Sequence, residues 1–261
     1  VSAKYIARWN GSSWSSVGGG VTTPAYALTV FDDGNGPALY AAGSLKFAGG
    51  VAVNSVAKWD GSVWSALGLG MGGPTKPSVN ALAVFDDGTG LALYAGGDFT
   101  IAGGVTAHRV AKWNGHNWSP LGSGVEQGSV NALAVFDDGS GPALFAAGNF
   151  TSAGGVPANR IAKWDGSVWS PLGSGIVGGV NALEVFDDGT GPALYAAGSF
   201  TSAGGVSADR IAKWDGTSWS ALVSAQQEVL SNLQELEVHD DGSGQALYAA
   251  GLFSLGAGEF A

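Results

Sequence analysis

The sequence predicts an all-β fold, a five-bladed β-propeller with four antiparallel strands in each blade. A motif of Trp, then Asp or Asn, then Gly, with a second Trp five residues after the first, occurs five times. It contains all ten tryptophans of the chain: Trp9, Trp14, Trp59, Trp64, Trp113, Trp118, Trp164, Trp169, Trp214 and Trp219. The first tryptophan of each pair advances by 50, 54, 51 and 50 residues, and four strand-like runs lie inside each period. One such unit cannot bury its own apolar face, so the units are expected to stack on one another.

The composition excludes several classes of function. The 261 residues include no cysteine, so neither a disulfide framework nor thiol chemistry is expected. The net charge of −10 argues against nucleic acid and anionic membranes as partners, although ten of the 21 acidic residues are five Asp-Asp pairs. No apolar run approaches the ~20 residues of a membrane helix. We therefore expect no membrane insertion, no cofactor and no targeting segment in this chain.

The third copy of the repeat illustrates the four strands of a blade. Strand A is expected at 130–136, strand B at 142–148, strand C at 159–164 and strand D at 168–172. All four runs are short, rich in β-branched, aromatic or small apolar residues, and separated by Gly and Asp. Pro171 has no N–H to donate to a neighbouring strand, so strand D is expected at the outer edge of the blade.

Two of the connections are predicted to be tight hairpin turns. The A–B connection reads Asp-Asp-Gly-x-Gly in every copy, first at 32–36, and the C–D connection is Asp-Gly or Asn-Gly, as at 165–166. Asp, Asn and Gly tolerate the positive φ that such turns need. The paired acids also look like part of a calcium loop, but no third acid follows them. Turn capping is therefore the preferred interpretation, with loose attraction of cations as the alternative.

Length variation is confined to the D–A connection. The strand A landmark Phe lies 33 residues before the second Trp of its blade in four copies, for example Phe136 and Trp169. From that Trp to the next strand A landmark the spacing varies between 17 and 21 residues. The variable connection leaves the outer edge of one blade and enters the centre of the next. Its two longest examples are 70–77 and 224–230.

The two ends of the chain are in phase with the repeat. Residues 1–9 match residues 206–214, which lead into strands C and D, and the last repeat ends on a strand B. We therefore expect one domain over residues 1–261, in which residues 1–20 and 232–261 form a shared closing blade. Such a blade closes the ring and leaves no central strand edge exposed.

Three stretches recur in the same order within the blades: Ala-Leu-Tyr-Ala-Ala-Gly, then Lys-Trp-Asp-Gly, then Trp-Ser-Pro-Leu-Gly. This order resembles the kelch-like propellers, including the central domain of galactose oxidase. The resemblance implies that strand A is the inner strand and that ligands bind on the face of the D–A and B–C connections. Kelch repeats carry Gly-Gly after strand B. This chain has Ala-Ala-Gly or, at 95–97, Ala-Gly-Gly, which indicates a separate propeller lineage.

The tryptophan pairs have two interpretations. Exposed Trp rings stack on sugars, which is typical of lectin-like propellers. A Trp at the same offset in every blade is instead expected to pack one blade on the next, with its indole N–H bonded to the backbone. We prefer the packing interpretation.

The most informative departure from the repeat lies in strand A, two residues before the landmark Phe. The five copies read Thr29, Ala83, Ala134, Glu184 and Glu237. Carboxylates on neighbouring inner strands are costly to bury without water, a partner or a ligand. They either line a water-filled channel or act as the paired carboxylates of an inverting glycosidase, which stand ~6.5–9.5 Å apart. Together with Gln226, Gln227 and Glu228 of a long D–A connection, they are the predicted polar contacts of any ligand.

These observations favour a non-catalytic, monomeric interaction scaffold, secreted or on a cell surface, with a protein or carbohydrate ligand. Five near-copies of one blade leave little room for an asymmetric catalytic apparatus, whereas repetition suits a multivalent surface. The three histidines fall in different blades or at different ends of a blade, so no metal site is expected: His108 at the start of a strand C, His116 in a C–D turn and His239 in strand A of the closing blade. The alternatives are a lectin-like binder with up to five equivalent sites, a glycoside hydrolase using Glu184 and Glu237, and an engineered repeat protein without a ligand. Scattered differences between copies, such as Lys46 and Phe47, fit natural drift better than design.

Overall fold

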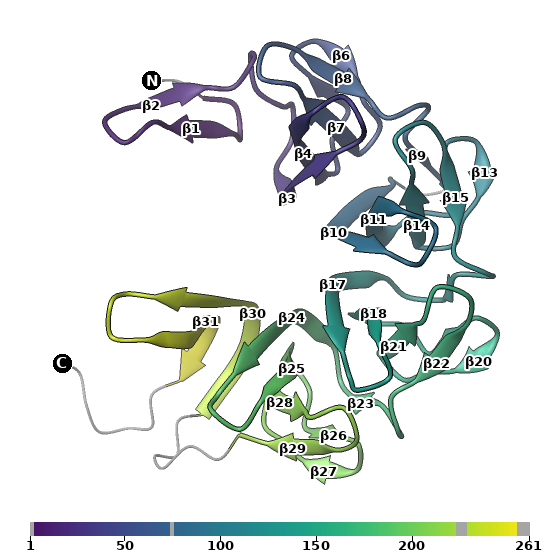
Figure 1. Ribbon diagram of the computed structural model, residues 1–261, viewed down its shortest axis with the longest axis vertical. Helices are drawn as coiled ribbons and strands as arrows, with labels where there is room; N and C mark the ends of the chain where they lie inside the picture. Colours follow the sequence, from purple (N-terminus) through teal and green to yellow (C-terminus); the bar gives the residue numbers. More distant parts are fainter. Residues whose placement is uncertain (1–2, 74–75, 223–228, 255–261) are drawn as a thin grey trace. The chain divides into compact units, whose positions relative to one another are not determined.

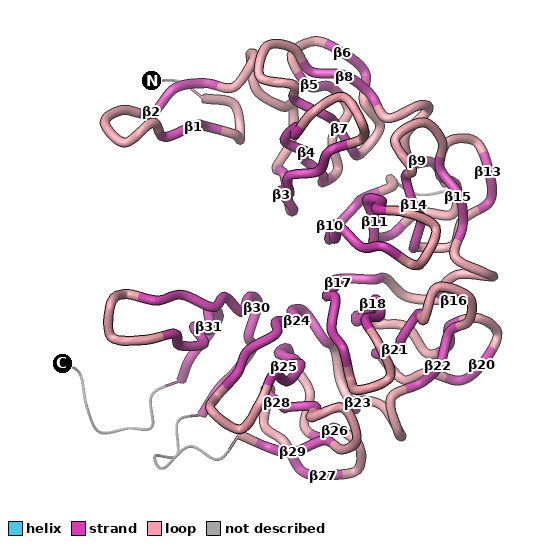
Figure 2. The backbone as a smooth tube through the Cα atoms, in the orientation of Figure 1, coloured by secondary structure: helices cyan, strands magenta, loops and turns pink. Residues whose placement is uncertain are grey.

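The chain folds into strands joined by turns and short loops, and its described part contains no helix (Figure 2). The computed structural model describes residues 3–73, 76–222 and 229–254. The chain divides into two compact units, Val1–Val125 and Glu126–Ala261.

The strands are mostly two to nine residues long. The first unit contains β1 (Ala7–Trp9), β2 (Trp14–Ser16), β3 (Ala25–Asp32), β4 (Pro37–Gly43), β5 (Phe47–Ala48), β6 (Val51–Ala52), β7 (Val56–Trp59), β8 (Trp64–Ala66), β9 (Met71–Gly72), β10 (Ser78–Asp86), β11 (Leu91–Asp98), β12 (Ile101–Ala102), β13 (Val105–Thr106), β14 (Val110–Trp113) and β15 (Trp118–Pro120). Strand β16 (Val125–Glu126) spans the boundary between the units. The second unit contains β17 (Val130–Asp137), β18 (Pro142–Gly148), β19 (Ser152–Ala153), β20 (Val156–Pro157), β21 (Ile161–Trp164), β22 (Trp169–Pro171), β23 (Ile176–Val177), β24 (Val180–Asp187), β25 (Pro192–Gly198), β26 (Ser202–Ala203), β27 (Val206–Ser207), β28 (Ile211–Trp214), β29 (Trp219–Ala221), β30 (Val229–Asp240) and β31 (Gln245–Ser254).

Four sheets have four antiparallel strands each, in the predicted order A-B-C-D (Figure 1). They are β3-β4-β7-β8, β10-β11-β14-β15, β17-β18-β21-β22 and β24-β25-β28-β29. Strand B of the third copy has the predicted bounds, and strand A extends one residue further, with Phe136 opposite Ala143. Pro171 lies on the edge strand β22, opposite Ala162. The prediction that strand D is an edge strand is therefore confirmed.

Strand B carries a glycine at or near its end because strand A approaches it closely there. Strand β17 has a bulge between Val130 and Ala132. A Cβ added at Gly148 would lie 2.1 Å from the carbonyl oxygen of Ser129, far inside contact distance. The equivalent distance to the nearest carbonyl oxygen is 2.4 Å at Gly43, 2.0 Å at Gly97, 2.2 Å at Gly198 and 2.3 Å at Gly251. Close packing of strands A and B thus explains the repeated Ala-Ala-Gly ending.

The B–C connection folds into a small hairpin, whereas the sequence analysis treated it as a loop. Strands β12 and β13 turn at Gly103 and Gly104, whose φ values of 58° and 88° suit a two-residue hairpin turn. On its other side β12 pairs with β9 of the preceding D–A connection, with Ala102 opposite Met71. In the second unit, β23, β26 and β27 repeat this arrangement. The B–C and D–A connections therefore lie at the same end of each sheet, which we call the connection end. The A–B and C–D turns lie at the opposite end, which we call the turn end.

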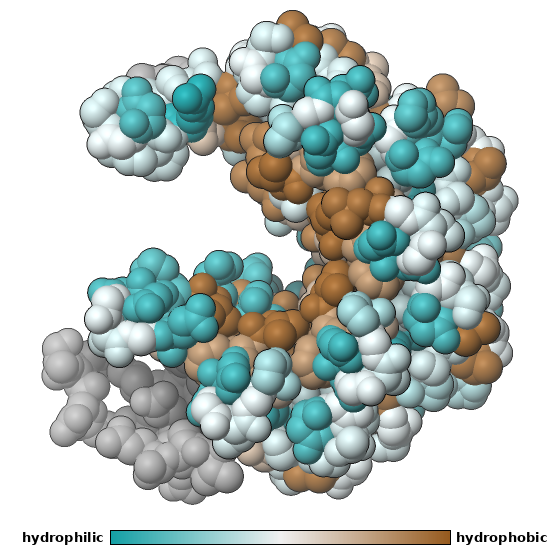
Figure 3. Space-filling model, viewed as in Figure 1, coloured by the Kyte–Doolittle hydropathy of each residue, from teal (hydrophilic) through white to brown (hydrophobic). Residues whose placement is uncertain are grey.

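The apolar core of each unit lies between neighbouring four-stranded sheets. In the first unit, Phe31 of β3 packs with Val79 and Leu93 of the next sheet, and all three are buried. In the second unit, Phe136 of β17 packs with Leu194 of β25. Burying a side chain of this size contributes roughly 1.5–3 kcal/mol. Hydrophobic surface also follows the inner strands, as over β3 and β10 of the first unit (Figure 3).

The expected closing blade is not formed as a four-stranded sheet among the described residues. Strands β1 and β2 pair only with each other, and β30 pairs only with β31. Each half is nevertheless built like its counterparts. Trp9 lies opposite Trp14, as Trp59 lies opposite Trp64. The phase match therefore predicted the two hairpins β1–β2 and β30–β31 correctly. That the two hairpins join in one closing blade stays a prediction.

Candidate functional site

The Asp-Asp-Gly turns are capped by their first aspartate. In the first turn, Asp32 Oδ1 accepts hydrogen bonds from the backbone N–H groups of Gly34 and Gly36, at 2.8 and 2.9 Å. The equivalent bonds occur in the other four turns, at Asp86, Asp137, Asp187 and Asp240. These contacts confirm the turn-capping interpretation.

The second aspartate of the turn holds a lysine from strand C. Lys112 Nζ lies 2.6 Å from Asp87 Oδ1, and the Tyr94 hydroxyl donates to Asp87 Oδ2 at 2.8 Å. Matching ion pairs are Lys58–Asp33, Lys163–Asp138 and Lys213–Asp188. The sequence analysis missed these pairs, although the lysine follows its aspartate by 25 residues in each of the four copies.

The environment of Asp87 indicates a structural role. Burial alone would raise the pKa of Asp87, but hydrogen bonds from Lys112, Thr89 and Tyr94 lower it to about 2. The side chains of Lys112 and Asp87 are only 12% and 8% exposed, so the pair is shielded from water. The Lys112 ammonium also lies 5.7 Å from the centre of the Tyr94 ring. These contacts join strands A, B and C of the sheet at its turn end.

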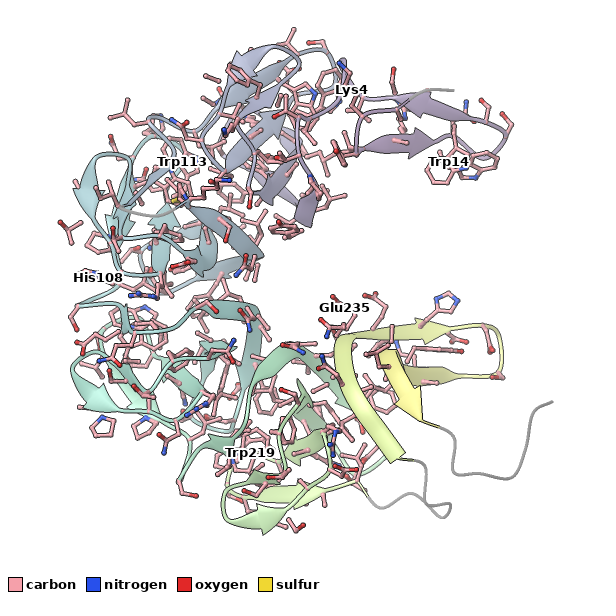
Figure 4. All side chains as sticks on the ribbon, turned by 180° about the vertical axis from the view of Figure 1, so that it is seen from behind. Lys4, Trp14, His108, Trp113, Trp219 and Glu235 are labelled. Atoms are coloured by element: carbon pink, nitrogen blue, oxygen red, sulfur yellow. The ribbon has the colours of Figure 1, made fainter. Side chains whose placement is uncertain are left out.

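Burial of the tryptophans supports packing rather than sugar stacking. Seven of them are buried, namely Trp64, Trp113, Trp118, Trp164, Trp169, Trp214 and Trp219. The indole N–H of Trp64 donates to the carbonyl of Val17 at 3.1 Å, and that of Trp118 to Leu67 at 2.9 Å. The expected hydrogen bond from the indole N–H to the backbone does not form in every copy. Four buried indole N–H groups have no acceptor in the described part of the chain: Trp113, Trp164, Trp214 and Trp219. Trp9 and Trp14 are exposed, and Figure 4 shows Trp14 on the β1–β2 hairpin.

Glu184 and Glu237 occupy the same register position on neighbouring strands of the second unit. Glu184 on β24 lies opposite Tyr195, and Glu237 on β30 lies opposite Tyr248. Burial raises the pKa of Glu184, and the negative charges of Glu237 and Glu235 raise it further. The structure therefore places the two carboxylates at equivalent register positions, and their role as ligand contacts stays a prediction.

Glu235 adds a third carboxylate that the sequence analysis did not single out (Figure 4). Burial and the charge of Glu237 raise the pKa of Glu235. The sequence feature that could have identified Glu235 is its position two residues before Glu237 on the same strand. The described residues contain no group of three or more His, Cys, Asp or Glu side chains able to hold a metal ion. The other predicted contacts, Gln226, Gln227 and Glu228, lie outside the described residues.

A groove lies at the connection end of the sheet β3-β4-β7-β8, in the first unit. Its volume is ≈ 720 Å³, within the range of small-molecule sites. Its lining residues are Thr22, Thr23, Ser44, Leu45, Lys46, Phe47, Asn54, Ser55, Lys76 and Pro77. The B–C connection of this sheet contributes, as do the D–A connections before and after it. The later of these is the long connection 70–77 that the sequence analysis singled out.

Two lysines make this groove basic in an acidic chain. Lys46 and Lys76 are exposed, and neither forms an ion pair with any residue that the structure describes. The described lining contains no acidic residue. The sequence analysis interpreted Lys46 and Phe47 as drift. The feature that could have pointed to this groove is that Lys46 replaces a threonine. Three other copies have that threonine at the equivalent position, at Thr100, Thr151 and Thr201.

Comparison with known families identifies the fold. The sheet order A to D, repeated in near-copies, is that of propeller blades. The family described as "Rax2 C-terminal beta propeller domain" matches residues 68–254, more than two thirds of the chain. The chain belongs to this β-propeller family. The prediction of an all-β propeller is thus confirmed, and the kelch-like type stays a prediction.

A search of curated proteins finds no match to the chain. In its described part, the propeller has no helix long and apolar enough to span a membrane.

Proposed function

We propose that this propeller is a non-catalytic interaction scaffold that binds a protein partner at the connection ends of its sheets. The observation that carries the proposal is a repeated exposed valine directly after the Gly-Gly turn of the B–C hairpin. The four copies are Val51, Val105, Val156 and Val206, each between 40% and 45% exposed. Single exposed apolar residues are ordinary, but here the same residue is exposed at the same place in two sheets of each unit. Such a repeated set, the valine array, suits multivalent binding.

The turn ends offer less to a specific partner. Their aspartates are used in capping and in ion pairs with lysine, as at Asp86 and Asp87. Their loops also have constant length, whereas the D–A connections vary. Binding residues usually collect on variable loops that a rigid scaffold presents. The location outside the cell or on its surface, and the monomeric state, stay predictions.

We also propose that the two units form one five-bladed ring over residues 1–261, closed by residues 1–20 and 232–261. Arg8 takes the place of the strand C lysine, and Asp241 takes the place of its aspartate. In the described structure the Tyr248 hydroxyl already donates to Asp241 at 3.4 Å, as Tyr94 donates to Asp87. The missing component of this cluster is a cation, which Arg8 would supply.

The scaffold proposal is tested by photo-crosslinking from matched valine positions. A photoreactive residue replaces Val105 or Val156 at the connection end, or Val63 or Val168 in the C–D turns. The two control valines are 59% and 58% exposed, so accessibility does not favour the test positions. A partner from the native source should crosslink from Val105 and Val156 and not from the control positions.

The quadruple substitution of Val51, Val105, Val156 and Val206 by Ser should abolish capture of that partner without changing the circular dichroism spectrum. Substitution of Val63 and Val168 by Ser should leave capture unchanged. Equal crosslinking from both ends, or capture that survives the quadruple substitution, would overturn the proposal.

A further inference from the structure

Ser55 lines the basic groove of the first unit and stands where the next three repeats have an arginine. Ser55 stands where the next sheet has Arg109, and both have positive φ values, 76° and 64°. The Arg109 guanidinium reaches from the start of strand C to the next D–A connection, where it donates to the Val125 carbonyl at 3.2 Å. Ser55 is too short to span that distance. Its hydroxyl donates to the Pro77 carbonyl of the following connection at 2.9 Å, and both residues line the groove.

The polar groups of the groove are divided into cations and acceptors. Thr23 donates its hydroxyl proton to the Ser44 carbonyl at 2.9 Å, so its oxygen is left to accept. Asn54 donates from Nδ2 to the Leu69 carbonyl at 2.9 Å, which leaves Oδ1 as an acceptor. The two lysine ammonium groups are the charged donors. A matching ligand therefore carries an anionic group together with several O–H donors.

Phe47 adds a flat apolar surface to this set. It is 45% exposed although its neighbours in the small hairpin, Leu45 and Ala48, are buried. The equivalent positions in the next three copies are Ile101, Ser152 and Ser202, so an aromatic ring occurs at this offset in the first sheet and not in those three. An aromatic ring beside hydrogen-bonding groups suits the apolar face of a sugar ring.

We propose that this groove binds an acidic saccharide, a sugar with a carboxylate group. The carboxylate lies between Lys46 and Lys76, the sugar hydroxyls donate to Thr23 Oγ1 and Asn54 Oδ1, and the ring packs on Phe47. An acidic peptide supplies the negative charge but few O–H donors, and a simple anion supplies neither donors nor a ring face. The site is single, because it depends on Ser55, and it is separate from the repeated valines.

The test is isothermal titration calorimetry on the full chain, with a trimer of galacturonic acid as the probe. The controls are the neutral galactose trimer, a trimer of glutamate and sodium acetate. We expect one site per chain, binding that weakens as salt rises, and affinity at least about tenfold lower for each control ligand. Galacturonate binding no tighter than that of the glutamate trimer or acetate would overturn the assignment, as would its absence.

Single substitutions locate the site. Lys46→Thr and Lys76→Ser should each weaken binding about tenfold, because each removes a hydrogen bond to a charged group. Phe47→Ile should weaken it while leaving the charge unchanged. Lys4→Thr removes a positive charge outside the lining residues and should change affinity less than about twofold. Equal effects of Lys4→Thr and Lys46→Thr would show non-specific attraction and overturn the proposal.

Ser55→Arg is the sharpest variant. It adds positive charge, so attraction by charge alone would strengthen binding. It also restores the side chain that spans this place in the next sheet, so a groove-specific ligand should lose all measurable binding. Stronger binding in this variant would contradict the proposal. None of these substitutions touches the valine array, so failure of saccharide binding and failure of partner crosslinking are separate results.

Discussion

At the residue scale, the repeat is held together by buried charge pairs as well as by apolar contacts. Each Lys–Asp pair connects strand C to the A–B turn of its own sheet, and a tyrosine hydroxyl completes the contact in three of the four sheets. In the third sheet Phe145 takes the place of the tyrosine. Shielding from water makes the pairs of Asp33, Asp87 and Asp138, whose side chains are 6–11% exposed, stronger than ordinary surface ion pairs, provided that both partners are present.

Removal of Lys112 should show this coupling. At pH 7, Lys112→Met is expected to lower the free energy of unfolding by about 1–2 kcal/mol, because Asp87 keeps its charge and loses its partner. Since the pKa of Asp87 is lowered to about 2 in the folded chain, its contribution is present above about pH 4 and declines as the pH falls toward 2. Urea unfolding at a series of pH values measures both effects.

Lys76→Met is the matched control, because Lys76 has no ion pair with a described residue. Its free energy of unfolding should stay within about 0.5 kcal/mol of the parent. A loss for Lys112→Met no larger than that of the control, or one equally large at pH 2, would contradict the assignment.

The buried tryptophans give a second prediction at this scale. Trp164 is 6% exposed, so Trp164→Ala should lower the free energy of unfolding by about 3–5 kcal/mol, the range for large core deletions. Fluorescence-monitored urea unfolding gives the value. A cost below about 1 kcal/mol would mean that the ring is not part of the core.

At the scale of elements, the glycine that ends strand B controls how strands A and B meet. Gly97→Ala would place a Cβ 2.0 Å from the carbonyl oxygen of Ser78, so backbone must move. We expect a loss of about 2–3 kcal/mol or more in the free energy of unfolding, as for other overpacked sites.

Gly72→Ala separates this clash from a general effect of glycine replacement. Gly72 lies in β9, and its added Cβ would meet Ile101 Cβ at 3.4 Å, which is ordinary contact. The variant should stay within about 1 kcal/mol of the parent in the same urea titration. If both glycine variants lose equal stability, the close approach of strands A and B is not the reason for the repeated glycine.

At the scale of the whole molecule, ring closure decides whether Trp9 belongs to a core. Its counterparts Trp113 and Trp164 are buried, whereas Trp9 is 51% exposed on the β1–β2 hairpin. If residues 1–20 join the closing blade, Trp9→Ala should cost about 3–5 kcal/mol, like Trp164→Ala. A cost near zero, measured by the same unfolding titration, would show that the hairpin stays unpartnered.

A double-mutant cycle on Arg8→Met and Asp241→Asn reports closure independently. The cycle should give a coupling energy of at least about 0.5 kcal/mol if the two side chains meet in the closing blade. Strictly additive effects of the two substitutions would argue against the closed ring.

The period of the tryptophan motif, the hairpin turns and the order of strands A to D were determined by the sequence alone. These features depend on local chemistry: Asp and Gly in tight turns, β-branched and aromatic residues in strands, and Pro171 at a sheet edge. Glu184 and Glu237 share a register position, opposite Tyr195 and Tyr248, because equivalent offsets in the repeat fall on equivalent strands. Copies of one repeat thus made the propeller fold predictable, whereas a ligand role for these carboxylates stays a prediction.

Only the tertiary structure decided which departures from the repeat form a site. Lys46 and Ser55 belong to a B–C connection and Lys76 to the D–A connection that follows, and nothing in their spacing shows that they line one groove. Its lining combines a serine that replaces the arginine of the next three repeats with Lys76 and Pro77 of the D–A connection. The B–C hairpin and the Lys–Asp pairs were missed for the same reason: each depends on contacts between segments that only folding brings together.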